Sequence, residues 1–429
     1  MALLILFGVL FGLMLLGAPI FVAMLASALV TLAVTDLGAA TVIPTQMAGG
    51  VAEAQLLAIP FFILMGELMS RAGLTQRIVD LLMVFFGRFR GGLAHVVIGV
   101  NAFASSISGS APASASMVSS AMLPAMQRAG YTPAFSAAVN ASAAVLGPVI
   151  PPSVPMVFVS LVTTMSLGQL LIGGIGPGLL MAAALFLVVI VQARKGKLPG
   201  ATVVPEAERR SLGVLFLRAV PALGAPVFII IGIAGGFVTI TEVAIIAAFY
   251  VLVLGLIYGT LRPRALYGIL REGAVFSSTI MMLFASVGGF TFIIAVQRVG
   301  DQIADLVASA QLAPVVFLLL TMVFFLLIGM VLDAVPAILI FLPILLPVAE
   351  ELGIDPIHFG VVAVVNLMIG LLTPPVGALL FVMTKIGRVR FGALVREVLP
   401  FLTALLCALT ITTFVPAVVT FIPRLFFGN

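Results

Sequence analysis

The sequence predicts an all-α, polytopic membrane protein made of two inverted repeats of about five spans, each with a re-entrant helical hairpin and a broken helix. First, the chain is 63% hydrophobic and only 8% charged, which excludes an ordinary soluble domain. Second, apolar stretches of about 17 or more residues, each long enough to cross a hydrocarbon core, recur from end to end. Third, several stretches are interrupted near their middle by helix-breaking residues, and one interrupted region occurs twice.

The repeated region covers residues 123–152, which match residues 346–375 without a gap, 223 positions later. The identical pairs are Leu123 and Leu346, Pro124 and Pro347, Gly130 and Gly353, Pro133 and Pro356, Val139 and Val362, Gly147 and Gly370, Pro151 and Pro374, and Pro152 and Pro375. In the same register Ser110 falls on Asp333. Two copies of a broken membrane helix, each preceded by a broken hairpin, are typical of a secondary transporter.

Charge and cysteine content exclude other classes of protein. The net charge of +5 does not indicate a nucleic-acid partner, because Lys and Arg lie in short clusters between apolar stretches, where they set orientation in a lipid bilayer. Cys407 is the single cysteine, which excludes a disulfide framework or a thiolate metal site. His95 and His358 lie on different segments and form no ligand pair.

The first repeat is predicted over residues 1–193. Residues 2–35 form two spans joined at Gly17-Ala18-Pro19, and a glycine-rich loop at 36–52 leads to a span at about 54–70. The charged residues of 71–90 have amphipathic spacing, which indicates an arm helix at the membrane interface.

A hairpin at about 92–127 follows, with halves at 92–106 and 112–127 around Ser-Gly-Ser-Ala-Pro. Basic residues flank the pair on both sides, so the positive-inside rule predicts that the chain enters the membrane and returns. A crossing at 134–166, broken at its prolines, and a span at 170–192 complete the repeat. Residues 194–214 are a polar, basic stretch, which we interpret as a cytoplasmic linker between the halves.

The second repeat, residues 215–429, has the same layout. Its segments are spans at 215–235, 241–259 and 274–296, an arm at 298–312, a hairpin at about 314–349 with halves at 314–330 and 334–349, a broken helix at 357–384 and a last span at 398–421. Because each half crosses the membrane an odd number of times, about five, the two halves are expected to lie upside down relative to one another.

The breaks carry the predicted binding chemistry. Proline lacks the N–H that would bond the carbonyl four residues earlier, so Pro151 and Pro152 are expected to free the carbonyls of Gly147 and Pro148. Pro374 and Pro375 are expected to free those of Gly370 and Leu371. The glycines would let a ligand approach the backbone. Free carbonyls and hydroxyls suit a monovalent cation, and half-helix N-termini suit an anion without Lys or Arg.

Three polar side chains near the breaks have two interpretations each. Asp333 is the one acid predicted at a hairpin tip in mid-membrane, where it would bind a cation or carry a proton, or cap its half-helix near a wet surface. Asn140 and Asn366 precede the double prolines, and they would bind ions or form hydrogen bonds between helices. The serines of 105–120 could serve as ligands or as small residues at helix contacts.

The chain resembles the large membrane subunit of the tripartite ATP-independent periplasmic (TRAP) transporters, the DctM-like family of the ion-transporter superfamily, over essentially its whole length. The motifs that carry this resemblance are Ile59-Pro60-Phe61-Phe62-Ile63, Gly66-Glu67-Leu68-Met69, Ser108-Gly109-Ser110-Ala111, Gly147-Pro148-Val149-Ile150-Pro151-Pro152-Ser153, Thr239-Ile240-Thr241-Glu242, Gly353-Ile354-Asp355-Pro356 and Gly370-Leu371-Leu372-Thr373-Pro374-Pro375-Val376-Gly377. One departure is Ala113-Ser114, where the family is expected to have Ala-Asp.

The resemblance implies a sodium-driven importer in the bacterial inner membrane that works by an elevator motion. It implies a periplasmic substrate-binding protein and a small four-helix membrane subunit as partners, the latter in a heterodimer with this chain. The implied substrate is a small anionic compound such as a C4-dicarboxylate, sialic acid, a sugar acid or a keto acid. No enzymatic activity is expected.

The resemblance also places two or more Na⁺ ions at the hairpin tips and broken helices. The expected sodium ligands are Ser106, Ser108, Gly109, Ser110, Asn140, Gly147, Pro148, Gly329, Asp333, Gly370, Thr373 and Gly377. The expected substrate contacts are Ser108, Ser110, Pro152, Ser153, Asn366, Thr373 and Pro375.

Three other classes of protein remain as alternatives. A stand-alone cation-coupled carboxylate symporter or antiporter would share the inverted hairpins but need no binding protein. An intramembrane enzyme is disfavoured, because no Ser-Lys, Gly-x-Gly-Asp or His-Glu-x-x-His arrangement occurs in the spans. A passive channel is disfavoured by the two mid-membrane breaks, which indicate bound-site alternation rather than an open pore.

Overall fold

The computed structural model describes residues 1–35, 41–52, 54–200, 212–235, 238–261 and 263–428. Every regular element in these ranges is helical. Seven helical stretches there are long and apolar enough to cross a membrane. They are Leu167–Arg194, Phe216–Ile233, Ile240–Ile257, Leu266–Val296, Pro314–Val331, Ala334–Glu351 and Phe391–Phe414. The prediction of an all-α, polytopic membrane protein is confirmed.

The N-terminal segment contains one helix that the sequence did not predict. The elements are α1 (Ala2–Leu15), α2 (Ile20–Thr35), α3 (Val42–Val51), the 3₁₀ turn η1 (Ala54–Leu57), α4 (Ala58–Arg71) and α5 (Leu74–Phe86). The predicted loop at 36–52 is therefore wrong for its second part, where α3 lies. Gly50 packs against α14 (Pro263–Val296) so closely that a β-carbon on it would lie 3.0 Å from the Phe284 carbonyl. The glycine that indicated a loop is a helix contact.

The first hairpin and broken helix have the predicted boundaries to within a few residues. The hairpin is α6 (Gly92–Ser108) with α7 (Ala111–Arg128), and the broken helix is α8 (Pro133–Ala144) with α9 (Val154–Val162). Pro133 occupies the first turn of α8, and the Thr132 hydroxyl accepts the Phe135 backbone N–H at 3.2 Å. The predicted span at 170–192 is a short helix α10 (Leu167–Gly173) followed by α11 (Ile175–Arg194).

The second half begins with α12 (Leu212–Gly235), whose first residues belong to the predicted linker at 194–214. Residues 201–211 of that linker lie outside the described ranges. Then follow α13 (Ile240–Ile257), α14, α15 (Val299–Ser309), α16 (Pro314–Val331), α17 (Ala334–Glu351), α18 (Pro356–Gly370), α19 (Ala378–Gly387), α20 (Phe391–Phe414) and α21 (Ala417–Phe427). Two boundaries were predicted wrongly. Helix α14 begins at Pro263, well before the predicted span at 274–296, and its Glu272 pairs with Arg71 at 3.0 Å. The last span is two helices, separated at Pro416.

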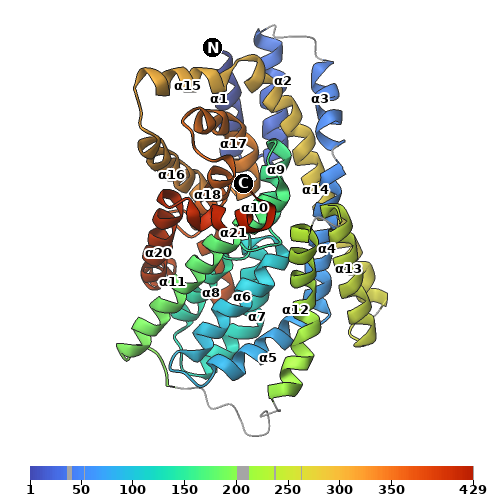
Figure 1. The fold of residues 1–429 in the computed structure, drawn as a ribbon, viewed down its shortest axis with the longest axis vertical. Coiled ribbons are helices and arrows are strands. Elements are labelled where there is room, and N and C mark those ends of the chain that lie inside the picture. Colours follow the sequence, from blue (N-terminus) through green and yellow to red (C-terminus); the bar gives the residue numbers. More distant parts are fainter. Residues whose placement is uncertain (36–40, 53, 201–211, 236–237, 262, 429) are drawn as a thin grey trace.

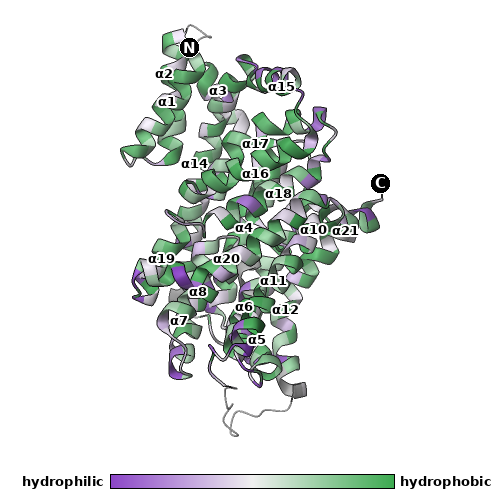
Figure 2. Ribbon diagram, turned by 90° about the vertical axis from the view of Figure 1, so that its left-hand side faces the viewer, coloured by the Kyte–Doolittle hydropathy of each residue, from purple (hydrophilic) through white to green (hydrophobic). Residues whose placement is uncertain are grey.

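The helices form two groups, which Figure 1 shows side by side. In one group, α14 packs against α2, α3 and α4, and α13 packs against α4. In the other group, both hairpins and both broken helices gather with α11 and α20. Figure 2 shows hydrophobic residues along most of the ribbon, with hydrophilic residues gathered at places that include α15 and the region around α5. This distribution is that of a protein embedded in a bilayer.

Candidate ion and substrate site

The tip of the first hairpin packs against the exit of the first broken helix. Gly109 at the tip has a φ of +63°, which favours glycine, and a β-carbon on it would lie 2.2 Å from Cγ2 of Val154. Val154 is the first residue of α9. The structure therefore brings together the tip and the break that the sequence predicts as one site.

The first break is buried and held by its own hydrogen bonds. Residues 147–149 and 151–153 are buried. The Ser153 hydroxyl donates to the Pro148 carbonyl and accepts the Met156 backbone N–H at 3.3 Å, which caps α9. The peptide bond between Pro151 and Pro152 is cis. The expectation that proline leaves the Pro148 carbonyl without a donor is wrong, because Ser153 supplies one.

The second hairpin packs against the second broken helix through two glycines. A β-carbon on Gly370, the last residue of α18, would lie 2.7 Å from the α-carbon of Gly329 in α16. A β-carbon on Gly329 would lie 2.8 Å from the Leu367 carbonyl oxygen. The prediction that Gly370 leaves room for a ligand is therefore wrong for its α-carbon, which the hairpin backbone covers.

The second break also satisfies carbonyls that the sequence predicts to be free. The Gly370 carbonyl accepts the Thr373 N–H at 2.9 Å, and that of Leu371 accepts the Leu379 N–H at 3.1 Å. The chain turns back at Gly377, where φ is +54° and a β-carbon would lie 3.0 Å from the Thr373 carbonyl oxygen. A carbonyl has two lone pairs, so a bonded one can still bind a cation. The peptide bond between Pro374 and Pro375 is cis, as in the first break.

The two breaks differ in exposure. Pro152 and Ser153 are buried, whereas Pro375 is exposed and Thr373 half-buried. The Thr373 hydroxyl donates to the Ile369 carbonyl at 2.9 Å, within its own turn. Of the two breaks, the second is thus the more accessible.

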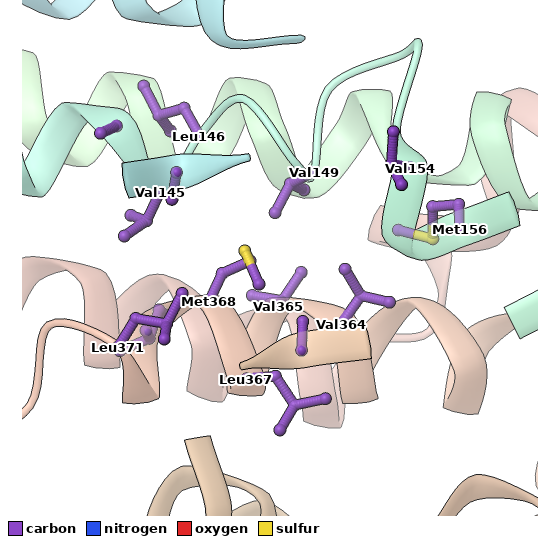
Figure 3. Packing of buried hydrophobic residues seen from close by; sticks show 14 of the residues in the cluster. Val145, Leu146, Val149, Val154, Met156, Val364, Val365, Leu367, Met368 and Leu371 are labelled. Carbon is purple, nitrogen blue, oxygen red and sulfur yellow. The ribbon is translucent and has the colours of Figure 1, made fainter. Parts of the chain in front are cut away.

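The exit half of each broken helix packs against the hairpin of the other half. Helix α9 contacts α17, and α19 contacts α7. Figure 3 shows the centre of this arrangement, where Val145 and Val149 of the first break lie opposite Val365 and Met368 of α18. The first break and α18, the half-helix that leads into the second break, therefore lie beside one another in the interior of the bundle.

Asp333 caps the second half of its hairpin. It is the N-cap residue of α17, and its Oδ1 accepts the Ala334 backbone N–H at 2.7 Å. The residue is exposed, as is Val331 next to the tip. The alternative role as a cap is thus observed, and a role in cation binding stays a prediction.

Asn140 is buried in a network that joins the first hairpin to α8. Its Nδ2 donates to the Ala115 carbonyl and to the Ser119 hydroxyl, both at 2.8 Å, and its Oδ1 accepts from Asn101 at 2.8 Å. This geometry is the hydrogen bonding between helices that the sequence left as one interpretation. Sequence reasoning did not select Asn101, although a buried asparagine inside an apolar run was a signal for it.

Two buried oxygens near the breaks have no partner among the described residues. Asn366 donates through Nδ2 to the Val362 carbonyl at 2.9 Å, but its Oδ1 is unpaired. The Ser142 hydroxyl is also buried and unpaired. Each residue lies within about one turn of the end of its half-helix, α18 or α8. An unpaired buried oxygen costs roughly 1–3 kcal/mol, so both are candidate ligands for a cation.

Three serines at the tip of the first hairpin, Ser106, Ser108 and Ser110, are also predicted as ligands. Ser110 is the N-cap residue of α7 and is half-buried. The side chains of Ser106 and Ser108 lie outside the described part of the structure. No cluster of three His, Cys, Asp or Glu side chains that could hold a metal occurs in the described ranges. The candidate ligands are instead carbonyl, hydroxyl and amide oxygens with Asp333.

Comparison with known proteins agrees with this architecture. Residues 7–418 match the family model described as "Tripartite ATP-independent periplasmic transporter, DctM component". The chain is 36% identical over 418 residues to the sialic acid TRAP transporter large permease protein SiaM of Vibrio cholerae, with 97% of each chain covered. It is 37% identical over 370 residues to the C4-dicarboxylate TRAP transporter large permease protein DctM of Pseudomonas aeruginosa, with 86% of each covered.

A solved structure has a similar fold. The Alcanivorax borkumensis YdaH transporter aligns with a TM-score of 0.67 and 17% sequence identity, over 92% of this chain and 96% of that one. At this identity the likeness supports the fold alone. The family match over nearly the whole length, and relatives above one-third identity, show that this chain belongs to the DctM family of TRAP transporter large permeases.

Proposed function

We propose that this chain is the transport subunit of a sodium-coupled importer of small organic acids. The observation that carries the proposal is the pairing of each hairpin tip with a break, Gly109 with Val154 and Gly329 with Gly370. Such pairs hold carbonyl oxygens, hydroxyls and half-helix N-termini at two places in an apolar bundle, of which the first is buried and the second is partly exposed. These groups suit a co-bound cation and anion.

The proposed substrate is a carboxylate. Two relatives are named for sialic acid and for C4-dicarboxylates, both of which carry carboxyl groups. Lys and Arg occur in the hairpins and broken helices only at two outer ends, at Arg128 of α7 and Lys385 of α19, and neither lies at a tip or a break. The charge of the anion would therefore be balanced by N-termini such as that of α9 at Ser153 and by bound Na⁺. Asn366, Ser142 and Asp333 are the side chains proposed to bind the ions.

We propose that the two halves are inverted repeats and that transport uses an elevator motion. The reciprocal contacts of α9 with α17 and of α19 with α7 support the repeat, because a pseudo-two-fold axis would generate one contact from the other. The hairpins and broken helices would move as one body against α2, α3, α4, α13 and α14. A close contact such as Gly329 with Gly370 would persist within the moving body.

The proposed partners follow from the family. A small membrane subunit would pack against this chain in the inner membrane, and a periplasmic binding protein would deliver the substrate. The dependence of uptake on sodium and on the binding protein is testable. Proteoliposomes that contain this chain and the small subunit should take up labelled organic acids only with an inward sodium gradient and only with the loaded binding protein.

The same assay separates the alternatives. Sodium-dependent uptake without a binding protein would favour a stand-alone symporter. Uptake that follows only the substrate gradient, with no requirement for sodium, would contradict coupling and favour a passive pathway. A potassium gradient of equal size is the matched control for osmotic and electrical effects.

A further inference from the structure

A groove between α11 and α20 lies outside the candidate transport site. Its volume is about 810 Å³, and its walls are apolar side chains of the two helices, with Phe135 and Tyr131 at the base. The wall residues recur at helical spacing, and they include Leu187 and Val191 of α11 and Ala404 of α20. Leu187 is 59% exposed and Val191 40% exposed, so the groove opens to the outside of the bundle.

One end of the groove is cationic. Lys195, Lys197 and Arg396 line it, together with a single acid, Glu397. All three basic residues are exposed. Arg396 to Ile411, the extent of the groove along α20, corresponds to about 22 Å at roughly 1.5 Å per residue. One leaflet of a bilayer, with its headgroup region included, is about 20–22 Å thick.

We propose that this groove binds an anionic phospholipid. Its acyl chain would lie between α11 and α20, and its phosphate would contact Lys195, Lys197 and Arg396. The dimensions favour a whole lipid of one leaflet, and the excess of positive charge favours an anionic headgroup over a neutral one. An apolar protein helix would fill the groove but leave the excess of positive charge at its end, three cations against Glu397, uncompensated.

Photo-crosslinking in nanodiscs tests the proposal on the full-length chain. Phosphatidylglycerol with a diazirine on its acyl chain is added at low fraction to a phosphatidylcholine bilayer, and the labelled peptides are mapped by mass spectrometry. Labelling should concentrate on the wall residues of α11 and α20, near Val191 and Cys407. A diazirine phosphatidylcholine at the same fraction should label this groove several-fold less.

Charge variants test the headgroup contact. Lys195→Gln with Lys197→Gln and Arg396→Gln should lower groove labelling by phosphatidylglycerol by roughly a hundredfold, since each Lys or Arg near an anionic lipid contributes roughly fivefold. The conservative set Lys195→Arg, Lys197→Arg and Arg396→Lys should retain the labelling. Lys385→Gln with Arg388→Gln and Arg390→Gln, which neutralises three exposed cations that do not line the groove, is the matched control.

Three results would overturn the proposal. The first is equal labelling by the two lipids, which would mean an adventitious acyl chain. The second is absence of label from the groove of a chain that elutes as a single species. The third is loss of labelling when the small membrane subunit is added, with crosslinks from Cys407 to that subunit, because the groove would then be a protein interface.

Discussion

Gly329 and Gly370 pack backbone against backbone, so that a β-carbon on Gly370 would lie 2.7 Å from the Gly329 α-carbon. Neither side of this contact is the movable end of a side chain. Because neither glycine has a side chain, the backbones of α16 and α18 come into direct contact, and this contact sets the separation of the hairpin from the broken helix. The same relationship in the first half uses a side chain, Val154, on one side and Gly109 on the other.

Gly370→Ala is expected to force α16 away from α18. Overpacking of a close contact costs roughly 1–3 kcal/mol, so the midpoint of thermal unfolding should fall and sodium-driven uptake should be lost or strongly reduced. Gly392→Ala is the matched control, because a β-carbon there meets no atom within 4 Å. Full uptake and an unchanged unfolding midpoint in Gly370→Ala would show that the hairpin is free to shift.

Asp333→Asn separates capping from charge. Asparagine caps a helix about as well as aspartate, so the Ala334 N–H keeps its acceptor and the unfolding midpoint should stay within about one degree. Removal of the charge should raise the sodium concentration for half-maximal uptake by at least about tenfold, which corresponds to about 1.4 kcal/mol. An unchanged sodium dependence would restrict Asp333 to the capping role.

Asn366 and Asn140 are expected to respond in opposite ways to replacement by leucine. Asn140→Leu removes the acceptor of an Asn101 N–H and the donor to the Ala115 carbonyl and the Ser119 hydroxyl. It should destabilise the protein by roughly 1–3 kcal/mol with or without sodium. Asn366→Leu removes an oxygen that is already unpaired in the described structure, so stability in potassium should be retained. A bound ion stabilises only the folded state, and the stabilisation that sodium gives the native chain should shrink in Asn366→Leu. Equal sodium stabilisation in both variants would exclude Asn366 as a ligand.

The positions of the hairpins could be predicted from the sequence because proline, glycine and charge mark their ends. The predicted halves 92–106 and 112–127 correspond to α6 (Gly92–Ser108) and α7 (Ala111–Arg128). The hydrogen bonds of the breaks could not be predicted. The rule that proline frees the carbonyl four residues earlier assumes a continuous helix, whereas the chain turns and lets Thr373 N–H reach the Gly370 carbonyl.

Helix α3 shows a second limit of sequence reasoning. The glycine-rich stretch 36–52, which includes Gly49 and Gly50, is predicted from the sequence as a loop. Glycine is unfavourable in a helix by about 1 kcal/mol. In the structure a β-carbon on Gly288 of α14 would lie 2.3 Å from the carbonyl oxygen of Gln46. Glycines on both helices therefore permit a close approach of α3 and α14, and the packing compensates for the poor propensity. A single sequence does not reveal which glycines face a neighbouring helix.

Val154→Ala is expected to rescue Gly109→Ala in part. The single change Gly109→Ala places a β-carbon 2.2 Å from Cγ2 of Val154 and also strains a φ of +63°, at a cost of about 1–2 kcal/mol for the backbone alone. Truncation of Val154 removes the 2.2 Å contact with Cγ2, but it leaves a 2.8 Å contact with the Val154 β-carbon and the strained φ. The double variant should therefore unfold at a temperature between those of Gly109→Ala and the native chain, and recover part of its uptake. If the losses of stability and uptake in the two single variants simply add in the double variant, the hairpin tip and α9 are not in contact during transport. That result would contradict the pairing of tip and break on which the proposed site depends.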